Sequence, residues 1–267
     1  MSEFRIPFGS AVETAIDWLI RTLGWFFNFI RTILQGAYKG LEDLLLSAPF
    51  WAVIVVVILL AFFAKGWKLA LGSAIGLVLI VGFGQWNYSM QTLALVLVAS
   101  IVALLIAIPL GILAARSNAA SAVIRPILDF LQTMPAMVYL IPALMLFRLG
   151  VTPGIVATIL FAVAPGVRLT ELGIRGVDKE VVEAGYAFGS SPGRVLRQIQ
   201  LPLAMPSIMA GVNQVIMLSL SMVVIAGMVG AGGLGEQVYT SLNRVNVGLG
   251  FEAGTSVVIL AMILDRI

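Results

Sequence analysis

The sequence contains no cysteine and no histidine, and only 11% of its 267 residues are charged. The absence of cysteine excludes disulfide frameworks, iron–sulfur clusters and thiolate zinc sites. The absence of histidine removes most zinc and haem sites, together with the usual general base at neutral pH. We therefore expect no metal site, no cofactor held by this chain and no enzymatic catalysis by it.

What the sequence does contain is apolar: 60% of its residues are hydrophobic, and the mean hydropathy is +1.07. A soluble domain is nearer half apolar and about a quarter charged. The composition therefore predicts an integral membrane protein in contact with lipid. The net charge of +3 comes from basic residues scattered among loops, so a nucleic-acid partner is not expected. Residues 1–9 lack an apolar core, so a cleavable signal peptide is not expected.

Residues 13–42 place polar side chains at steps of three and four, which form one stripe of a helix: Glu13, Asp17, Arg21, Asn28, Arg31, Gln35 and Lys39. Burying Arg21 and Arg31 in a span would cost roughly 3 kcal/mol each. We therefore expect residues 1–48 to form an external amphipathic arm whose helix lies in the membrane interface. One hypothesis for this arm is that it braces a dimer.

Seven apolar stretches follow the arm and predict an all-α, polytopic membrane protein: 50–64, 69–84, 90–115, 127–147, 151–167, 203–230 and 252–264. The first two, within residues 49–89, are expected to be accessory to a core over residues 90–267. Ten Lys and Arg residues fall in one set of loops and two, Arg148 and Arg244, in the other. Basic loops stay in the cytoplasm, so the N-terminus is expected outside and the C-terminus inside.

The polar loop over residues 168–200 predicts a compact helix–turn–helix. Asp178 can cap a first helix that continues through Phe188 and stops at Gly189. Ser191 can cap a second helix with Pro192 at its first position, and Pro202 is expected to mark the boundary with the next span. Two short helices between spans suit docking into a groove of a soluble partner.

The same loop carries residues at the fixed spacing E-A-A/G-x3-G-x9-I-x-L-P, which resembles the cytoplasmic signature of ABC-importer permeases. Longer stretches resemble the glycine betaine/proline betaine permeases, the ProW-like family, over about residues 90–267: 108–117, 126–147, 168–174, 200–235 and 258–267. Relatives continue beyond the position of Ile267, so the sequence is expected to be trimmed there.

This resemblance implies a type I importer permease in a bacterial cytoplasmic (inner) membrane, acting as a homodimer. It also implies a cytoplasmic ATPase subunit, which would bind ATP–Mg because this chain has no Walker A sequence. A separate extracytoplasmic binding protein would deliver a quaternary-ammonium osmolyte. The residues implied to couple to the ATPase are Glu183, Ala184, Gly185, Gly189, Arg194, Arg197, Ile199, Leu201 and Pro202. Glu183 could instead be a solvated glutamate, and the two arginines could be topology signals only.

Residues that could line a pathway are less well defined. Proline frees backbone carbonyls in a span, so Pro135 with Met137 and Tyr139 is one group, although ordinary helix bending is the alternative. Asn213 and Gln214 are a second group, with hydrogen bonding between helices as the alternative. Asp129 is expected to pair with Arg125, four residues earlier. The glycine-rich residues 227–235 predict a flexible or closely packed external gate, or a simple turn.

The sequence also admits three other functions. A permease of the same class could carry choline, carnitine or an amino acid. An osmotically gated channel would need no ATPase, which the spaced motif disfavours. A membrane enzyme would need a cluster of intramembrane carboxylates or histidines, which the sequence does not offer.

Overall fold

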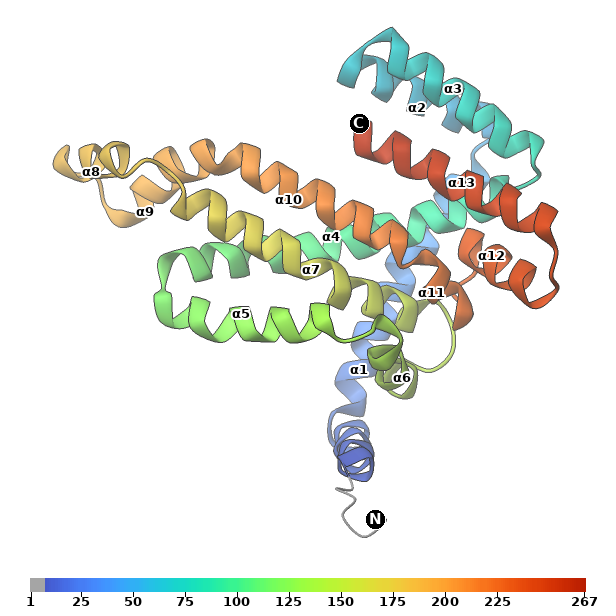
Figure 1. Cartoon of the computed structure of the whole chain (residues 1–267), viewed down its shortest axis with the longest axis horizontal. Helices are drawn as coiled ribbons and strands as arrows, with labels where there is room; N and C mark the ends of the chain where they lie inside the picture. The colour runs from blue at the N-terminus through green and yellow to red at the C-terminus, as the bar shows by residue number, and fades with distance from the viewer. Residues whose placement is uncertain (1–7) are drawn as a thin grey trace.

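The structure, a computed structural model, describes residues 8–267, and every regular element among them is a helix. This confirms the all-α prediction. The elements are α1 (Phe8–Ser47), α2 (Phe50–Lys65), α3 (Trp67–Gly82), α4 (Trp86–Arg116), α5 (Asn118–Thr133), α6 (Ala136–Phe147), α7 (Val151–Arg175), α8 (Lys179–Ala187), α9 (Pro192–Val195), the π-helical turn η1 (Leu196–Gln200), α10 (Leu201–Ser221), α11 (Val223–Met228), α12 (Gly233–Asn243) and α13 (Val247–Arg266). Figure 1 shows α8 and α12 at opposite ends of the long axis.

Three long helices, α4, α7 and α10, form the centre of the molecule, and small residues let them approach closely. A Cβ atom at Gly111 of α4 would lie 2.5 Å from Cβ of Thr170 in α7. A Cβ atom at Gly166 of α7 would lie 2.8 Å from Cβ of Ala107 in α4. Lipid tails are as apolar as the side chains, so membrane helices associate through such close packing.

Four helical runs are long and apolar enough to cross a membrane: α4, α7, Pro192–Gly227 and α13. Two pairs, α1 with α2 and α5 with α6, meet the same criteria only together, and they are bent by 104° and 99°. α3 is apolar but has 16 residues, fewer than the ~20 that a straight crossing needs. All seven predicted stretches are helical, but length and composition support four to six crossings rather than seven.

The stretch predicted as one span over residues 127–147 is two helices, α5 and α6, joined at a bend of 99°. α5 ends at Thr133, and Met134 is extended, with φ −74° and ψ 131°. Pro135 then occupies the N-cap of α6. A proline disfavours the helical conformation of the residue before it, so the chain turns sharply at Met134.

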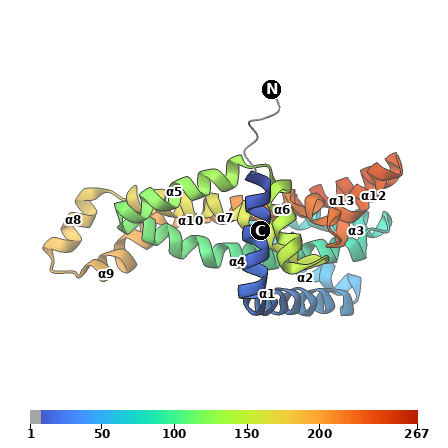
Figure 2. The same ribbon diagram turned by 90° about the horizontal axis from the view of Figure 1, so that it is seen from below.

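α1 is kinked, and it packs against α4, α6 and α7. Leu23 has φ −115° and ψ 17°, which divides the helix into two halves that run in different directions (Figure 2). In the second half, Leu34 and Tyr38 are buried in the main core with residues of α4 and α7. The Phe27 ring meets the Phe147 ring of α6 edge-on, with centroids 5.7 Å apart.

The polar stripe predicted for α1 is exposed in its first half, at Glu13, Asp17 and Arg21. In the second half, Asn28 and Lys39 are exposed, whereas Arg31 and Gln35 are half-buried. Residues 1–7 of the predicted arm lie outside the described residues. The interfacial position of the arm and its bracing role stay predictions.

The hairpin of α2 and α3 packs against α13 (Figure 1). Leu77 and Ile80 of α3 share an apolar cluster with Ile259 and Ile263 of α13. A Cβ atom at Gly76 would lie 2.6 Å from Cγ2 of Ile259, so the two helices are in close contact. The predicted accessory segment is thus joined to the last helix of the chain.

We predict that Gly111→Ala destabilises the protein, because the new methyl group would meet the Thr170 side chain and the Val167 carbonyl oxygen, 2.8 Å away. Overpacking of this kind costs about 1–3 kcal/mol. Gly72→Ala in α3 is the matched control, since nothing lies within 4 Å of its Cβ position. Thermal unfolding of the two variants in detergent should show a lower midpoint for Gly111→Ala alone. Equal midpoints would contradict the close packing of α4 on α7.

Candidate functional site

The predicted docking element is a helical hairpin at one end of the molecule, built from α8, α9 and η1 (Figure 1). The Asp178 side chain caps α8, because its Oδ1 accepts the Glu180 amide at 2.9 Å. Glu180 in the first turn adds a negative charge where the helix dipole favours one. The predicted start of this helix is therefore confirmed.

Gly189 ends α8, also as predicted. Its φ of +78° is a left-handed conformation that favours glycine. The Gly189 amide donates to the Tyr186 carbonyl at 2.9 Å, and the Ser190 amide donates to the Gly185 carbonyl at 3.2 Å. These two bonds make the Schellman arrangement that satisfies carbonyl groups at the end of a helix.

The second arm of the hairpin passes through the π turn η1 into α10, which begins at Leu201 with Pro202 in its first turn. The predicted boundary at Pro202 is therefore present, although the chain stays helical across it. The chain is helical from Pro192 to Ser221, and the wide π turn η1 ends at Gln200, two residues before Pro202. A proline ring in a regular α-helix clashes with the carbonyl four residues earlier, and local widening relieves that clash. Ser191 is at the N-cap, but its carbonyl, not its side chain, accepts the amides of Arg194 and Val195.

Three of the nine predicted coupling residues pack against other parts of the protein: Gly185, Ile199 and Leu201. Gly185 is buried, and a Cβ atom there would lie 2.5 Å from Cδ1 of Ile199 and 3.5 Å from Cγ2 of Val195. The terminal methyl group of Ile199 can rotate, so this position accommodates the alanine that the spaced motif also allows. Leu201 packs against an apolar cluster that includes Ile174 of α7.

The other predicted coupling residues are exposed: Glu183, Ala184, Gly189, Arg194, Arg197 and Pro202. Within residues 8–267, Glu183 and the two arginines take part in none of the ion pairs. Their charges are therefore available to a partner.

Phe188 completes this surface, and sequence reasoning did not single it out. Its side chain is 91% exposed, more than any other large hydrophobic residue among those described. The signal was present: an aromatic residue stands beside the helix-ending glycine of the largest polar loop. Exposed aromatic residues beside unpaired charges are typical of protein–protein contact surfaces.

The five predicted pathway residues are not brought together. Pro135 and Met137 are exposed at the start of α6, whereas Tyr139 is 5% exposed and lines a cavity of about 490 Å³ between α6 and the first half of α1. Gln214 is exposed on α10. Asn213 donates through Nδ2 to Oδ1 of Asp265 in α13 at 2.7 Å, which is a hydrogen bond between helices.

A charged cluster joins α5 to α7 and overturns the predicted pairing of Asp129 with Arg125. Asp129 pairs instead with Arg168 of α7. Arg125 binds Glu171 through Nη2 at 3.0 Å and Nε at 3.3 Å. Arg168, Glu171 and Arg175 are spaced by three and four residues, so one face of α7 presents them all to α5.

Glu171 is the buried centre of this cluster. Its Oε1 accepts from Ser121 Oγ at 2.8 Å and lies 3.0 Å from Nε of Arg175. Sequence reasoning gave Glu171 no role, although its spacing from Arg168 and Arg175 was a usable signal. Arg125, Asp129, Arg168, Glu171, Leu172 and Arg175 line a cavity of about 320 Å³.

The glycine-rich residues 227–235, at the opposite end, are closely packed. A Cβ atom at Gly235 would lie 2.0 Å from the Val223 carbonyl oxygen. The Gly233 amide donates to Gln91 Oε1 at 3.0 Å, and the Leu234 amide donates to Thr92 Oγ1 at 2.8 Å. Two side chains of α4 thus hold the start of α12, which favours the closely packed alternative over the flexible one.

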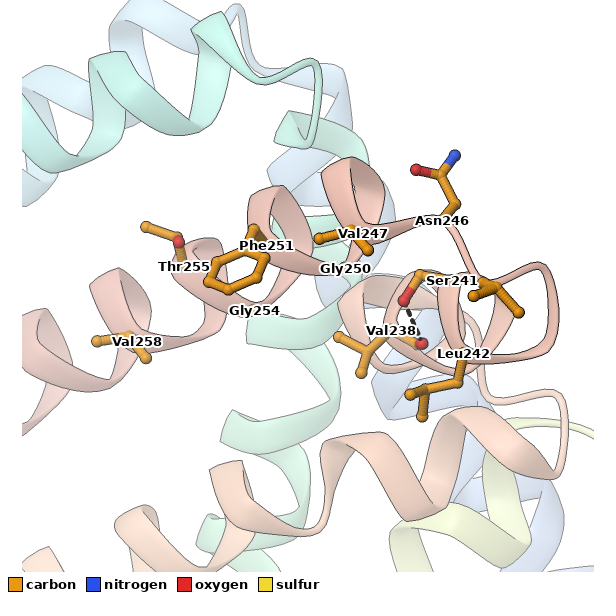
Figure 3. Close-up of a pocket in the computed structure, with 11 residues that line it drawn as sticks. Val238, Ser241, Leu242, Asn246, Val247, Gly250, Phe251, Gly254, Thr255 and Val258 are labelled. Carbon is orange, nitrogen blue, oxygen red and sulfur yellow. Dashed lines mark hydrogen bonds between the residues drawn. The ribbon is translucent and has the colours of Figure 1, made fainter.

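A cavity of about 700 Å³ lies between α12 and α13 (Figure 3). Its lining is mainly apolar and includes Val238 and Leu242 of α12 with Phe251 and Val258 of α13. The Asn246 side chain accepts the Leu249 amide at 3.1 Å and so caps α13. The turn before it holds Val245 at φ +51° with its side chain exposed.

A sequence profile of the family "binding-protein-dependent transport system inner membrane component" matches residues 107–265. The chain belongs to this family. The match spans the hairpin, the charged cluster and the long helix between the two ends of the molecule. The resemblance seen in the spaced motif is thereby confirmed.

Relatives of known function extend the similarity to nearly the whole chain. The glycine betaine/carnitine transport permease GbuB of Listeria monocytogenes is 46% identical over 98% of this chain and 94% of its own. ProW of Escherichia coli, a glycine betaine/proline betaine permease, is 46% identical over 98% of this chain and 74% of its own. OpuAB of Bacillus subtilis, a glycine betaine permease, is 43% identical over 98% and 93%. The similarity therefore includes the arm, beyond the predicted limit of residues 90–267.

Among solved structures, an inward-facing form of the MetNI methionine ABC transporter matches with a TM-score of 0.63. The match covers 68% of this chain and 91% of that chain at 22% identity, so it shows the fold. The type I importer permease fold is confirmed. Membership of the family makes this chain a multi-pass membrane subunit of a transport system rather than an enzyme.

Proposed function

We propose that this chain is the permease of an ATP-driven importer for glycine betaine or a closely related quaternary-ammonium osmolyte. The observation that carries the proposal is the exposed hairpin with unpaired charges, in a chain 43–46% identical to permeases named for glycine betaine. Carnitine is a second candidate cargo, because the name of GbuB includes it. The transport mechanism would be alternating access between the two sides of the membrane.

The two ends of the molecule take different partners in this proposal. The hairpin faces the cytoplasm and docks on an ATPase subunit that binds ATP–Mg, with Phe188 as an apolar anchor between Glu183 and the arginines. The end with α12 faces outward and receives cargo from a substrate-binding protein. The N-terminus is then external and the C-terminus cytoplasmic, as the distribution of basic residues favours.

The proposal also includes a second copy of this chain. The apolar cavity between α12 and α13 supports it, because Leu242, Val247 and Phe251 leave large apolar surfaces open there. A contact between two copies related by a two-fold axis is self-complementary, so residues near the axis meet their own counterparts. The cargo pathway would lie between the two copies.

We predict that proteoliposomes holding this chain, its ATPase and its binding protein accumulate labelled glycine betaine only with internal ATP. Unlabelled glycine betaine should compete with the label, and choline should not. Accumulation of choline or carnitine in its place would keep the mechanism and correct the cargo. Flux that needs no ATP and follows osmotic shock would instead indicate a channel.

We predict that Glu183→Lys, Gly189→Pro and Phe188→Ala each abolish or strongly reduce ATP-driven uptake without preventing membrane insertion. The first reverses a charge at the docking surface, the second removes the amide that bonds to the Tyr186 carbonyl, and the third removes the exposed ring. Phe63→Ala in α2 is the matched control, because Phe63 is 82% exposed but lies far along the chain from the hairpin. Normal uptake by the three hairpin variants would contradict docking at this surface.

We predict that Phe251→Cys forms a disulfide-linked dimer in membranes treated with a mild oxidant. The chain has no cysteine of its own, so the single thiol reports only on its own position. Phe63→Cys is the control and should stay monomeric on a non-reducing gel. The α12–α13 face would not be the contact between copies if the two variants cross-linked equally or if neither did.

A further inference from the structure

We propose that the charged cluster between α5 and α7 is a weak binding site for the zwitterionic cargo on its way out of the permease. The proposal rests on the proposed function for the identity of the cargo. It names a site on this chain for both charged groups of that cargo, a carboxylate and a quaternary ammonium.

The cluster holds guanidinium groups that its own carboxylates do not saturate. Arg175 uses all three of its nitrogens, on Glu171, on Asn118 Oδ1 and on the Ala114 carbonyl oxygen. Arg125 uses Nε and Nη2 on Glu171, and Arg168 uses Nη2 on Asp129. Within the described part of the chain, Nη1 of Arg125 and both Nε and Nη1 of Arg168 therefore remain available to an incoming carboxylate.

The two acids of the cluster differ in what they offer a ligand. The Glu171 side chain is 3% exposed and is held by two arginines and a serine, so its role is structural. The Asp129 side chain is 63% exposed and has one partner, Arg168, which is itself 41% exposed. An ion pair that faces water contributes little to stability, so a ligand can exchange with it at little cost.

The charges favour a zwitterion over a simple anion. Three arginines and two acids leave a net charge of +1 around the cavity. An anion on Arg168 would lie close to the Asp129 carboxylate and be repelled by it. A zwitterion places its carboxylate on Arg168 and Arg125 while its ammonium group compensates Asp129. The cavity, about 320 Å³, holds the liquid volume of about ten water molecules, enough for a small osmolyte.

The position of the site suits a late step of transport. The cluster occupies the last two turns of α7, and Asp178, which caps α8, follows three residues after Arg175. It is thus at the same end as the docking hairpin, which the proposed function places in the cytoplasm. A ligand there would have crossed the membrane and would lie beside the element that contacts the ATPase.

The test is ligand-observed NMR on this chain alone in nanodiscs, with glycine betaine, choline, acetate and inorganic phosphate as separate probes. Glycine betaine should show saturation transfer. Choline, which lacks the anionic group, and acetate and phosphate, which lack the cationic group, should bind about tenfold more weakly. Asp129→Asn and Arg168→Gln should each weaken glycine betaine binding by about tenfold, whereas Arg168→Lys should restore most of it.

Arg116→Gln is the matched control, since Arg116 is an exposed basic residue at the end of α4 outside the cluster. It should bind like the wild type, and the thermal midpoints of all four variants should agree. Binding that survives Asp129→Asn and Arg168→Gln, or equal binding of phosphate or choline, would overturn the proposal. ATP-driven uptake by the complete transporter without any binding to this chain would overturn the site alone and leave the proposed function standing.

Discussion

The centre of this molecule depends on the contact of α7 with α4 and α10, where glycine and alanine residues let the helices approach closely. In lipid, helices gain little from hiding apolar surface, so their association depends on how closely the backbones can approach. Gly166 lies against Ala107 of α4, and Gly173 lies against Ser207 of α10. The same helix carries the charged residues that bind α5 in its last two turns. α7 therefore fixes the positions of the charged cavity and, through its C-terminal end, of the hairpin.

The hairpin of α8, α9 and η1 contains two sets of residues within one short motif, one that packs and one that is exposed. Gly185, Ile199 and Leu201 determine its shape, because they pack the arms together and tie them to the body. Glu183, Arg194 and Arg197 leave their charges unpaired within residues 8–267, and Phe188 leaves its ring in solvent. An exposed aromatic ring beside unpaired charges is a combination suited to contact with a partner. The spacing of the motif therefore places both the packing residues and the exposed residues.

Sequence reasoning succeeded where the determinant was local. The cap at Asp178 and the stop at Gly189 follow from single residues and their neighbours, and the apolar stretches are all helical. It failed where a distant segment decided the outcome. Asp129 and Arg125 are four residues apart on one helix, yet both bind α7, because Arg168 and Glu171 lie across from them. Pro202 lies in the first turn of α10, as predicted, but the sequence did not reveal that the chain stays helical before it through a π turn. The five pathway candidates lie on two separate helices, three at the start of α6 and two on α10, and only one of them lines the cavity beside α6.

The helical run from Pro192 to Gly227, which includes the π turn η1 and a turn at Met222, has a mechanical consequence. Its 36 residues make a rod about 54 Å long at 1.5 Å per residue. One end carries the second arm of the docking hairpin, and the other meets the glycine-rich segment that α4 clasps through Gln91 and Thr92. A tilt of about 10° around its midpoint moves the two ends about 5 Å in opposite directions, by the same helix geometry. In the proposed mechanism, a small tilt of this run would therefore displace the hairpin and the glycine-rich segment together.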